Sequence, residues 1–335
     1  MIPVDEQLQS LSAVLDETES RLSAGSHAAG RVWPTGFDVL DTYLSGGLRS
    51  GELTLLSGPQ GLGKTTYALQ ILRNVCQSGR SAVYFSFEHD PQSVLQRLIA
   101  IEAGEIAGVN GVPISRVREA MESLDGNGDL AERLKTFPGG ALAVETVAKY
   151  AEHLMVHRST GNTTTLETIE TMADQTRQAT GQLPLVIVDY LQKVRWMDQS
   201  VSEEDRITAV VEGLKDLSLE RNVPVLAVVA ADKTGIEMGK RMRVHNMRGS
   251  SSLAYEADVV LIMNDKFDVV ARHHLVYNTS NAERFRDWAV VTIEKNRSGL
   301  DKVDLEFRKR FDQGRFETQG NIVAEQLVDE RVYVD

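Results

Sequence analysis

One short segment combines glycines, a lysine and two hydroxyl side chains in a pattern that suits phosphate chemistry. The sequence GPQGLGKTT follows an apolar run, LTLLS. Glycine raises the entropic cost of ordering a backbone, so a folded protein does not favour it without a reason. Such a glycine-rich stretch indicates a ligand that approaches the backbone closely. The segment fits the pattern G-x-x-x-x-G-K-[ST], whose backbone amides surround a polyphosphate at the start of a helix. The predicted phosphate-binding residues are Gly58, Pro59, Gln60, Gly61, Leu62, Gly63, Lys64, Thr65 and Thr66.

Two side chains of this segment and two distant acids have distinct expected roles. Lys64 would contact the β and γ phosphates and Thr65 would hold Mg²⁺, so ATP and Mg²⁺ are the expected cofactors. Asp189 ends the apolar run LPLVIVD, and Glu88 ends AVYFSFE. Both acids would emerge at the carboxyl ends of strands, where α/β sheets bind ligands. Asp189 would complete the metal site, and Glu88 would deprotonate the attacking water. A helix-capping role is the alternative for either acid.

The apolar pattern predicts the elements that must position these residues. Short β-branched runs are typical of strands buried on both faces, and they are LTLLS, AVYFSF, HLMVH, LPLVIVD, VPVLAVVA and ADVVLIM. Residues 164–181 and 207–222 between them have helical periodicity and end at Gly or Asn. Residues 288–310 alternate in polarity around a turn at 296–300, as an antiparallel pair does. The predicted fold is therefore α/β, a mostly parallel sheet with helices on both faces and a C-terminal antiparallel edge.

The chain divides into three parts by composition. No composition break interrupts residues 31–316, which predicts one α/β domain, and residues 317–335 form an acidic tail. Residues 1–30 comprise a polar helix with one apolar face and a linker of small residues that would give it reach. Two interpretations stay open: the helix folds onto its own domain, or it is an arm that lies in a groove of a neighbouring subunit. The apolar face consists of Leu8, Leu11, Leu15 and Leu22.

Composition excludes several classes of protein. The 335 residues are 42% hydrophobic and 25% charged, as in a globular protein. A single cysteine, Cys76, rules out an internal disulfide and fits the reducing cytoplasm. The longest apolar run is too short to cross a bilayer, so no membrane association is expected. The net charge of -12 argues against a broad nucleic-acid-coating surface but leaves room for a local basic channel.

One segment, DKTGIEMGKRMRVHNMR, reverses the acidic character of the chain. It lies between two predicted strands, where flexible cations could follow the backbone of a single-stranded nucleic acid. The alternative is a solvated basic loop. The candidate nucleic-acid contacts are Lys233, Lys240, Arg241, Arg243 and Arg248.

Two further groups of residues have weaker signals. An earlier loop adds Lys193, Arg195 and Trp196, and the tryptophan ring could stack on a base. His153 and His157 stand four apart, but they flank a strand, where side chains do not converge, so zinc is not expected.

Several motifs occur in the order seen in DnaB-like replicative helicases, a hexameric branch of the RecA-fold ATPases. They are SGPQGLGKTT, YFSFEHDPQSVLQRLIA, LVIVDYLQKV, MRGSSSLAYEADVVLIM and VTIEKNRSG. The chain resembles this family from residue 35 to about 316. The resemblance implies a RecA-like P-loop NTPase core and an ATP-driven motor that acts on single-stranded DNA as a homo-oligomeric, hexameric ring. It also implies that Lys295 and Arg297 reach into the nucleotide of the next subunit. From the residues alone, a solvated turn explains this pair.

The sequence departs from the family pattern in three places. The family usually has Ser-Gln at the positions of Val229 and Ala230, where the glutamine senses the γ phosphate. Gly249 replaces an acidic residue. The family carries a large N-terminal domain that meets the primase, whereas about 34 residues precede the match here, which speaks against a primase interaction. The missing glutamine, the missing N-terminal domain and the acidic net charge favour a second hypothesis, a KaiC- or RadA-like ATPase that switches or remodels protein partners without unwinding DNA. The basic segment and the full order of motifs favour the DNA motor.

Overall fold

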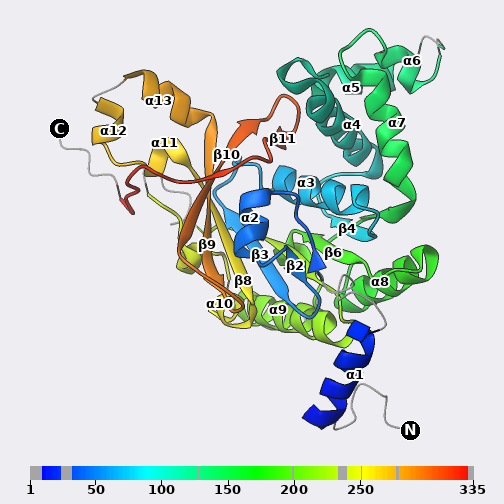
Figure 1. The fold of residues 1–335 in the computed structure, drawn as a ribbon, viewed down its shortest axis with the longest axis vertical. Helices are drawn as coiled ribbons and strands as arrows, with labels where there is room; N and C mark the ends of the chain where they lie inside the picture. Colours follow the sequence, from blue (N-terminus) through cyan, green and yellow to red (C-terminus); the bar gives the residue numbers. More distant parts are fainter. Residues whose placement is uncertain are drawn as a thin grey trace.

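The computed structural model describes residues 10–23, 32–124, 126, 128–197, 200–232, 240–249, 251–276 and 279–330. Within them, ten strands form one sheet in the order β11-β10-β9-β8-β3-β7-β6-β4-β5, with β12 paired to β10 (Figure 1). The predicted strands all occur, and they are β3 (Leu53–Gly58), β4 (Ala82–Ser86), β5 (Leu154–Arg158), β6 (Leu185–Asp189), β7 (Val225–Ala230) and β8 (Val259–Asp265). These six strands run parallel. The prediction of a mostly parallel sheet is confirmed.

Successive residues of each central strand point to opposite faces of the sheet, and each face carries its own core. Leu56 on β3 and Ile187 on β6 belong to one core, whereas the adjacent Leu55 and Val188 belong to the other. All four side chains are fully buried, and burying one such side chain stabilises the fold by about 1.5–3 kcal/mol. This two-sided burial explains why the strands are nearly continuous apolar runs.

Helices cover both faces of the sheet (Figure 1). The first face packs against α2 (Asp38–Tyr43), α3 (Lys64–Gln77), α4 (Pro91–Ala107) and α7 (Gly140–Tyr150). The second face packs against α8 (Leu166–Thr180), α9 (Glu203–Glu220) and α10 (Ser252–Glu256). Smaller elements are β1 (Val32–Trp33), β2 (Leu48–Arg49), α5 (Ile114–Glu122), α6 (Leu130–Leu134), α11 (Lys266–Val269), α12 (His273–Val276) and α13 (Thr279–Arg286). No helix among the described residues has the length and apolarity that a membrane span requires.

The C-terminal part forms the antiparallel edge that the sequence predicts. Strand β9 (Trp288–Asn296) pairs antiparallel with both β8 and β10 (Val303–Arg310). Strands β11 (Arg315–Phe316) and β12 (Asn321–Ile322) extend this edge. The described part of the acidic C-terminal segment returns along the domain, since Leu327 pairs with Val270 and Glu330 with Lys240.

Helix α1 (Leu11–Ser23) exposes its leucines. The exposed fractions are 86% for Leu11, 57% for Leu15 and 65% for Leu22, whereas Leu8 lies outside the described residues. In Figure 1 the helix projects beyond α9 at the lower edge of the molecule. Its apolar face is therefore not covered by the described part of its own chain.

Candidate nucleotide-binding site

The phosphate loop joins β3, which ends at Gly58, to α3, which begins at Lys64. Gly61 and Gly63 have φ angles of 79° and 87°, in the left-handed region that favours glycine. A Cβ at Gly63 would also lie 2.8 Å from the Phe311 ring. Most predicted loop residues line one pocket, but Gly58, Pro59 and Leu62 do not, and Leu62 packs into the core. The N-terminus of α3 thus faces the pocket with its unpaired amides.

The Lys64 ammonium group is held by the loop itself. It donates hydrogen bonds to the carbonyls of Gly58 over 2.7 Å and Pro59 over 2.9 Å. An ammonium group has three N–H donors, so one remains for an anion. Burial lowers the pKa of Lys64, while the nearby carboxylates of Asp189 and Glu88 raise it.

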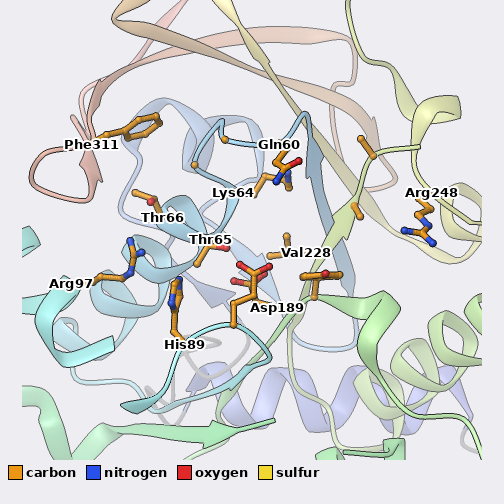
Figure 2. Close-up of a pocket in the computed structure, with 16 residues that line it drawn as sticks. Gln60, Lys64, Thr65, Thr66, His89, Arg97, Asp189, Val228, Arg248 and Phe311 are labelled. Atoms are coloured by element: carbon orange, nitrogen blue, oxygen red, sulfur yellow. The ribbon is translucent and has the colours of Figure 1, made fainter. Parts of the chain in front are cut away.

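The pocket has a volume of about 680 Å³ and is lined by both predicted acids, Glu88 and Asp189. Figure 2 shows Asp189 beside Thr65. Asp189 is the last residue of β6, and Glu88 lies two residues after the neighbouring parallel strand β4. The N–H of Phe87 donates to the Asp189 carbonyl over 2.9 Å, which fixes the two strand ends relative to each other. The lining residues include Gln60, Lys64, Thr65, Thr66, Glu88, His89, Arg97, Asp189, Tyr190, Val228, Ala230, Arg248 and Phe311.

The two oxygens of the buried Asp189 carboxylate differ. Oδ2 accepts a hydrogen bond of 2.8 Å from the Tyr84 hydroxyl, whereas Oδ1 accepts none from any residue that the structure describes. Burial raises the pKa of Asp189, and the Tyr84 and Thr65 hydroxyls and the Lys64 ammonium group oppose this rise. Carboxylate and hydroxyl oxygens are ligands that suit Mg²⁺. The orphaned oxygen beside Thr65 therefore fits the predicted metal site.

Arg97 and His89 also line the pocket, and the sequence interpretation gave neither a role. Asp90 caps α4 by accepting a hydrogen bond of 2.8 Å from the Ser93 N–H. The cap starts the helix after Glu88 and carries Arg97 back toward the phosphate loop (Figure 2). The capping residue Asp90 predicts a helix start, and a helix that starts there would bring the cation Arg97 near the strand ends. The sequence could therefore have predicted a role for Arg97 in this site. Burial lowers the pKa of both Arg97 and His89.

The end of β7 presents small side chains to the pocket. Val229 is fully buried in the second core, whereas Val228 and Ala230 line the pocket. Neither alanine nor valine can hydrogen-bond a phosphate through its side chain. The backbone N–H of Ala230 instead donates to the Gln192 side chain over 3.1 Å.

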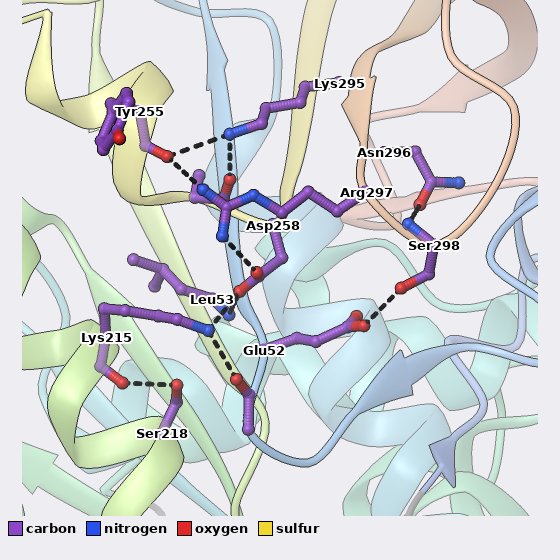
Figure 3. A network of polar contacts seen from close by, with 12 residues as sticks. Glu52, Leu53, Lys215, Ser218, Tyr255, Asp258, Lys295, Asn296, Arg297 and Ser298 are labelled. Carbon is purple, nitrogen blue, oxygen red and sulfur yellow. Dashed lines mark hydrogen bonds and ion pairs between the residues drawn. The ribbon is translucent and has the colours of Figure 1, made fainter.

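Lys295 and Arg297 lie at the end of β9 (Figure 3). Neither residue lines the pocket of its own chain. Lys295 donates to the carbonyls of Ala254 and Ala257, over 2.8 and 2.5 Å. Arg297 donates to the Tyr255 carbonyl over 2.6 Å. Both cations therefore bind the C-terminal end of α10. Burial lowers the pKa of Lys295, and Arg297 lowers it further.

Asp258 anchors this cation pair to the sheet (Figure 3). Its Oδ1 lies 3.2 Å from Arg297 Nη1. Its Oδ2 accepts hydrogen bonds of 2.8 Å from Lys215 and from the backbone N–H of Leu53. The acid thus joins β9, α9 and β3, and it holds Arg297 on a rigid base.

The predicted nucleic-acid contacts are spread over different environments. Arg241 is only 7% exposed, forms an ion pair with Asp304 and donates to Thr292 over 3.0 Å. This buried position differs from the expectation of a flexible cation, because Asp304 on β10 reaches the loop from the far edge of the sheet. Arg243 binds Glu294 over 2.9 Å and Asp329 over 2.6 Å.

Lys240 and Arg248 are exposed. Arg248 binds the half-exposed Glu203 over 2.8 Å and lines the nucleotide pocket. Lys240 pairs through its backbone with Glu330. Lys233 lies outside the described residues.

The remaining candidates do not line the nucleotide pocket. Trp196 packs against the second core, and Lys193 lies over the Tyr190 ring at 5.5 Å. His157 hydrogen-bonds the Ser159 hydroxyl over 2.9 Å. In the described part of the chain, no three His, Cys, Asp or Glu residues are grouped in a way that could hold a metal ion.

The sheet order, the phosphate loop and the acids beside it define a P-loop NTPase with a RecA-like fold. A sequence model of the DnaB-like helicase C terminal domain matches residues 33–317, and the chain belongs to this family. The resemblance seen in the sequence is thereby confirmed.

Individual relatives agree with this assignment. The replicative DNA helicase DnaB of Haemophilus influenzae is 26% identical over 329 residues, which cover 97% of this chain and 62% of the relative. The corresponding helicase of Rickettsia bellii is 22% identical and covers 89% of this chain and 58% of the relative. The chain thus spans about three fifths of the length of these relatives.

Solved structures show the same fold. An isolated ATPase domain superimposes with a TM-score of 0.71 at 19% identity, covering 92% of this chain and 99% of that domain. A DnaB-like replicative helicase described with its primase interactions gives 0.68 at 19% identity, covering 92% of this chain and 67% of that one.

Proposed function

We propose that the protein hydrolyses ATP and uses the energy to move along single-stranded DNA. The observation that carries the ATPase function is the convergence of Lys64, Asp189 and Glu88 in one pocket. Thr65 and the unpaired oxygen of Asp189 would hold Mg²⁺, which when bound neutralises charge on the β and γ phosphates. Lys64 binds the phosphates through its remaining N–H donor.

Glu88 is the proposed general base. It is exposed within the pocket and follows the strand beside that of Asp189, so a water molecule between it and the γ phosphate can reach its carboxylate. Arg97 adds a positive charge from the same chain. A preorganised cation of this kind stabilises charge that develops as the terminal phosphate departs.

The active site is proposed to be shared between subunits. Lys295 and Arg297 do not line the pocket of their own chain, and both are held at the C-terminal end of α10. In a head-to-tail ring each pair would face the nucleotide of a neighbour. We propose a hexamer, as the family resemblance implies, and the exposed leucines of α1 would bind a groove on the next subunit.

Single-stranded DNA is proposed to contact Lys240 and Arg248. Both side chains are exposed, and the ion pair of Arg248 with Glu203 lies at the surface. A surface ion pair of this kind contributes about 0–1 kcal/mol, so a phosphate can replace the carboxylate. The curated relatives are replicative DNA helicases, which supports DNA as the ligand.

One observation favours the second candidate, a switch that acts on protein partners. Ala230 lines the pocket where a phosphate-sensing glutamine would be expected, so hydrolysis lacks one side-chain contact with the loop. A conformational change driven by hydrolysis requires contacts that differ between the nucleotide states. This candidate predicts ATP hydrolysis without strand separation.

Three assays distinguish the two functions. Filter binding across a salt series measures affinity for single-stranded DNA, steady-state hydrolysis measures stimulation by that DNA, and a forked duplex measures unwinding. The motor predicts binding, stimulation and strand separation. Absence of DNA affinity at low salt would eliminate the motor and leave the switch.

One solved relative is described with its primase interactions, and a pull-down with purified primase would test whether this chain binds that partner. The single cysteine, Cys76, is buried, in keeping with the proposed cytoplasmic location.

A further inference from the structure

Three segments meet at the side chain of Gln192, which lies in the turn Leu191–Lys193, three residues after Asp189. The exposed fraction of Gln192 is 7%. Its Oε1 accepts a hydrogen bond of 3.1 Å from the Ala230 N–H, and its Nε2 donates one of 2.9 Å to the Arg248 carbonyl. One amide thus joins the end of β6, the end of β7 and the loop of residues 244–249. This loop, called the Arg248 loop, carries the proposed DNA contact Arg248.

The β7 end and the loop are also joined directly. The N–H of Arg248 donates to the Ala230 carbonyl over 2.8 Å, and that of Asp232 donates to the Asn246 carbonyl over the same distance. Ala231 and Met247 form an antiparallel bridge between these bonds. The two strands of this short ladder therefore move together, and Gln192 connects the ladder to the segment that carries Asp189.

The pocket touches every part of this junction. Tyr190, Ala230 and Arg248 all line it, whereas Gln192 stands behind them and does not. A change of nucleotide that shifts the Asp189 segment would pull on the buried amide. Breaking either of its bonds would leave a polar group unpaired in the interior, which is costly, so the segments respond as a unit.

We propose that Gln192 is a positioning residue that transmits the nucleotide state of the pocket to the Arg248 loop. This role rests on the proposed function, in which that loop contacts single-stranded DNA. Through these hydrogen bonds the nucleotide state of the pocket would affect DNA binding by the loop. The end of β7 carries Val229 and Ala230 and has no phosphate-sensing side chain that could do this. The group acts through hydrogen bonds to the loop and does not touch the substrate.

Two variants separate the bonds of the amide. Gln192→Met keeps a similar shape but removes both the donor and the acceptor. Gln192→Glu keeps an acceptor for the Ala230 N–H but cannot donate to the Arg248 carbonyl. Gln182→Met is the matched control, since Gln182 donates its amide to the Gly79 carbonyl over 3.1 Å and lies away from the pocket.

The first test needs no DNA. Hydrogen exchange of residues 244–249 is measured with ADP and with a non-hydrolysable ATP analogue. The wild-type protein and the Gln182 control should protect this segment differently in the two nucleotide states, and both Gln192 variants should lose that difference. A folded variant that responds like the wild type would overturn the proposal, as would a wild-type loop that does not respond to nucleotide.

The second test measures the coupling itself. The affinity for an oligothymidine strand should differ about fivefold or more between the two nucleotide states in the wild type, a usual size for coupled sites. The ratio should approach one in Gln192→Met, while hydrolysis without DNA stays within about twofold of the wild-type rate. An unchanged ratio would overturn the role of Gln192. A wild-type protein that binds no DNA would refute the motor, and the exchange experiment would still decide the role of Gln192.

Discussion

The hydroxyl of Tyr84 donates a hydrogen bond of 2.8 Å to Oδ2 of Asp189, and both side chains are buried. The bond links the middle of β4 to the end of β6 and fixes the rotation of the carboxylate. It leaves Oδ1, which is buried and unpaired among the described residues, as the oxygen available to a metal-bound water or to the metal. Tyr84 thus orients the candidate metal ligand Asp189 by binding the oxygen that does not face the metal site.

The first prediction follows from this contact. Tyr84→Phe should raise the Mg²⁺ concentration for half-maximal hydrolysis by about 10- to 100-fold, the usual effect of losing a partner that orients a ligand. Hydrolysis is measured across a Mg²⁺ series. Tyr67→Phe is the control, because the Tyr67 hydroxyl is buried and has no hydrogen-bond partner among the described residues. Equal Mg²⁺ curves for the two variants would contradict an orienting role for Tyr84.

The second prediction separates binding from chemistry. Lys64→Ala should abolish nucleotide binding, because Lys64 contacts phosphate in the ground state. Glu88→Gln should keep binding and lose about 10²- to 10⁴-fold in turnover, as expected for a general base. Nucleotide affinity and steady-state hydrolysis are measured for both. Turnover close to wild type in Glu88→Gln would rule out Glu88 as the base.

The local motifs explain how much of this site the sequence could predict. The phosphate loop consists of consecutive residues, Asp189 ends the apolar strand β6, and Glu88 lies two residues after the apolar strand β4. Because the carboxyl ends of parallel strands share one edge of the sheet, their convergence followed from the fold class. Strands that are buried on both faces have nearly continuous apolar sequences, and this pattern allowed the sheet to be predicted.

Long-range pairing explains what the sequence interpretation missed. Arg241 looks like its neighbours in a basic loop, but its partner Asp304 is 63 residues away and on another strand. The described part of the acidic tail shows weak patterning, yet backbone pairs fix it to Val270 and Lys240. Neither contact leaves a local periodic signal, so only the folded arrangement reveals them.

The third prediction concerns the cations at the end of β9. A Lys64→Ala chain and an Arg297→Ala chain should each be inactive, and a mixture should regain hydrolysis. The physical reason is that Arg297 lies outside its own pocket, so an Arg297→Ala subunit, whose phosphate loop is intact, can receive the arginine of a Lys64→Ala neighbour. Such an arginine is worth about 10³- to 10⁵-fold in rate. No recovery in complexes proven to contain both chains would refute a shared site.

The fourth prediction addresses the exposed helix α1. Deletion of residues 1–30 should produce smaller assemblies in sedimentation with ATP and leave the thermal midpoint of the domain nearly unchanged. The reason is that Leu11, Leu15 and Leu22 are exposed on their own chain and can bury apolar area only against another surface. An unchanged oligomer with a large loss of thermal stability would show that the helix packs onto its own domain.

The last prediction separates two arginines of the basic segment. Arg248→Gln should weaken binding of single-stranded DNA and make the slope of log affinity against log salt shallower by about 0.7, because one phosphate contact is lost. Arg241→Gln should instead lower the free energy of unfolding by about 1–3 kcal/mol, because the Asp304 carboxylate loses its buried partner, although it stays partly exposed and keeps its hydrogen bond from Thr292. Filter binding across a salt series measures the first effect, and urea unfolding measures the second. A wild-type slope in Arg248→Gln would remove Arg248 from the DNA contact, and a shallower slope in folded Arg241→Gln would show that the buried arginine leaves Asp304 to bind DNA.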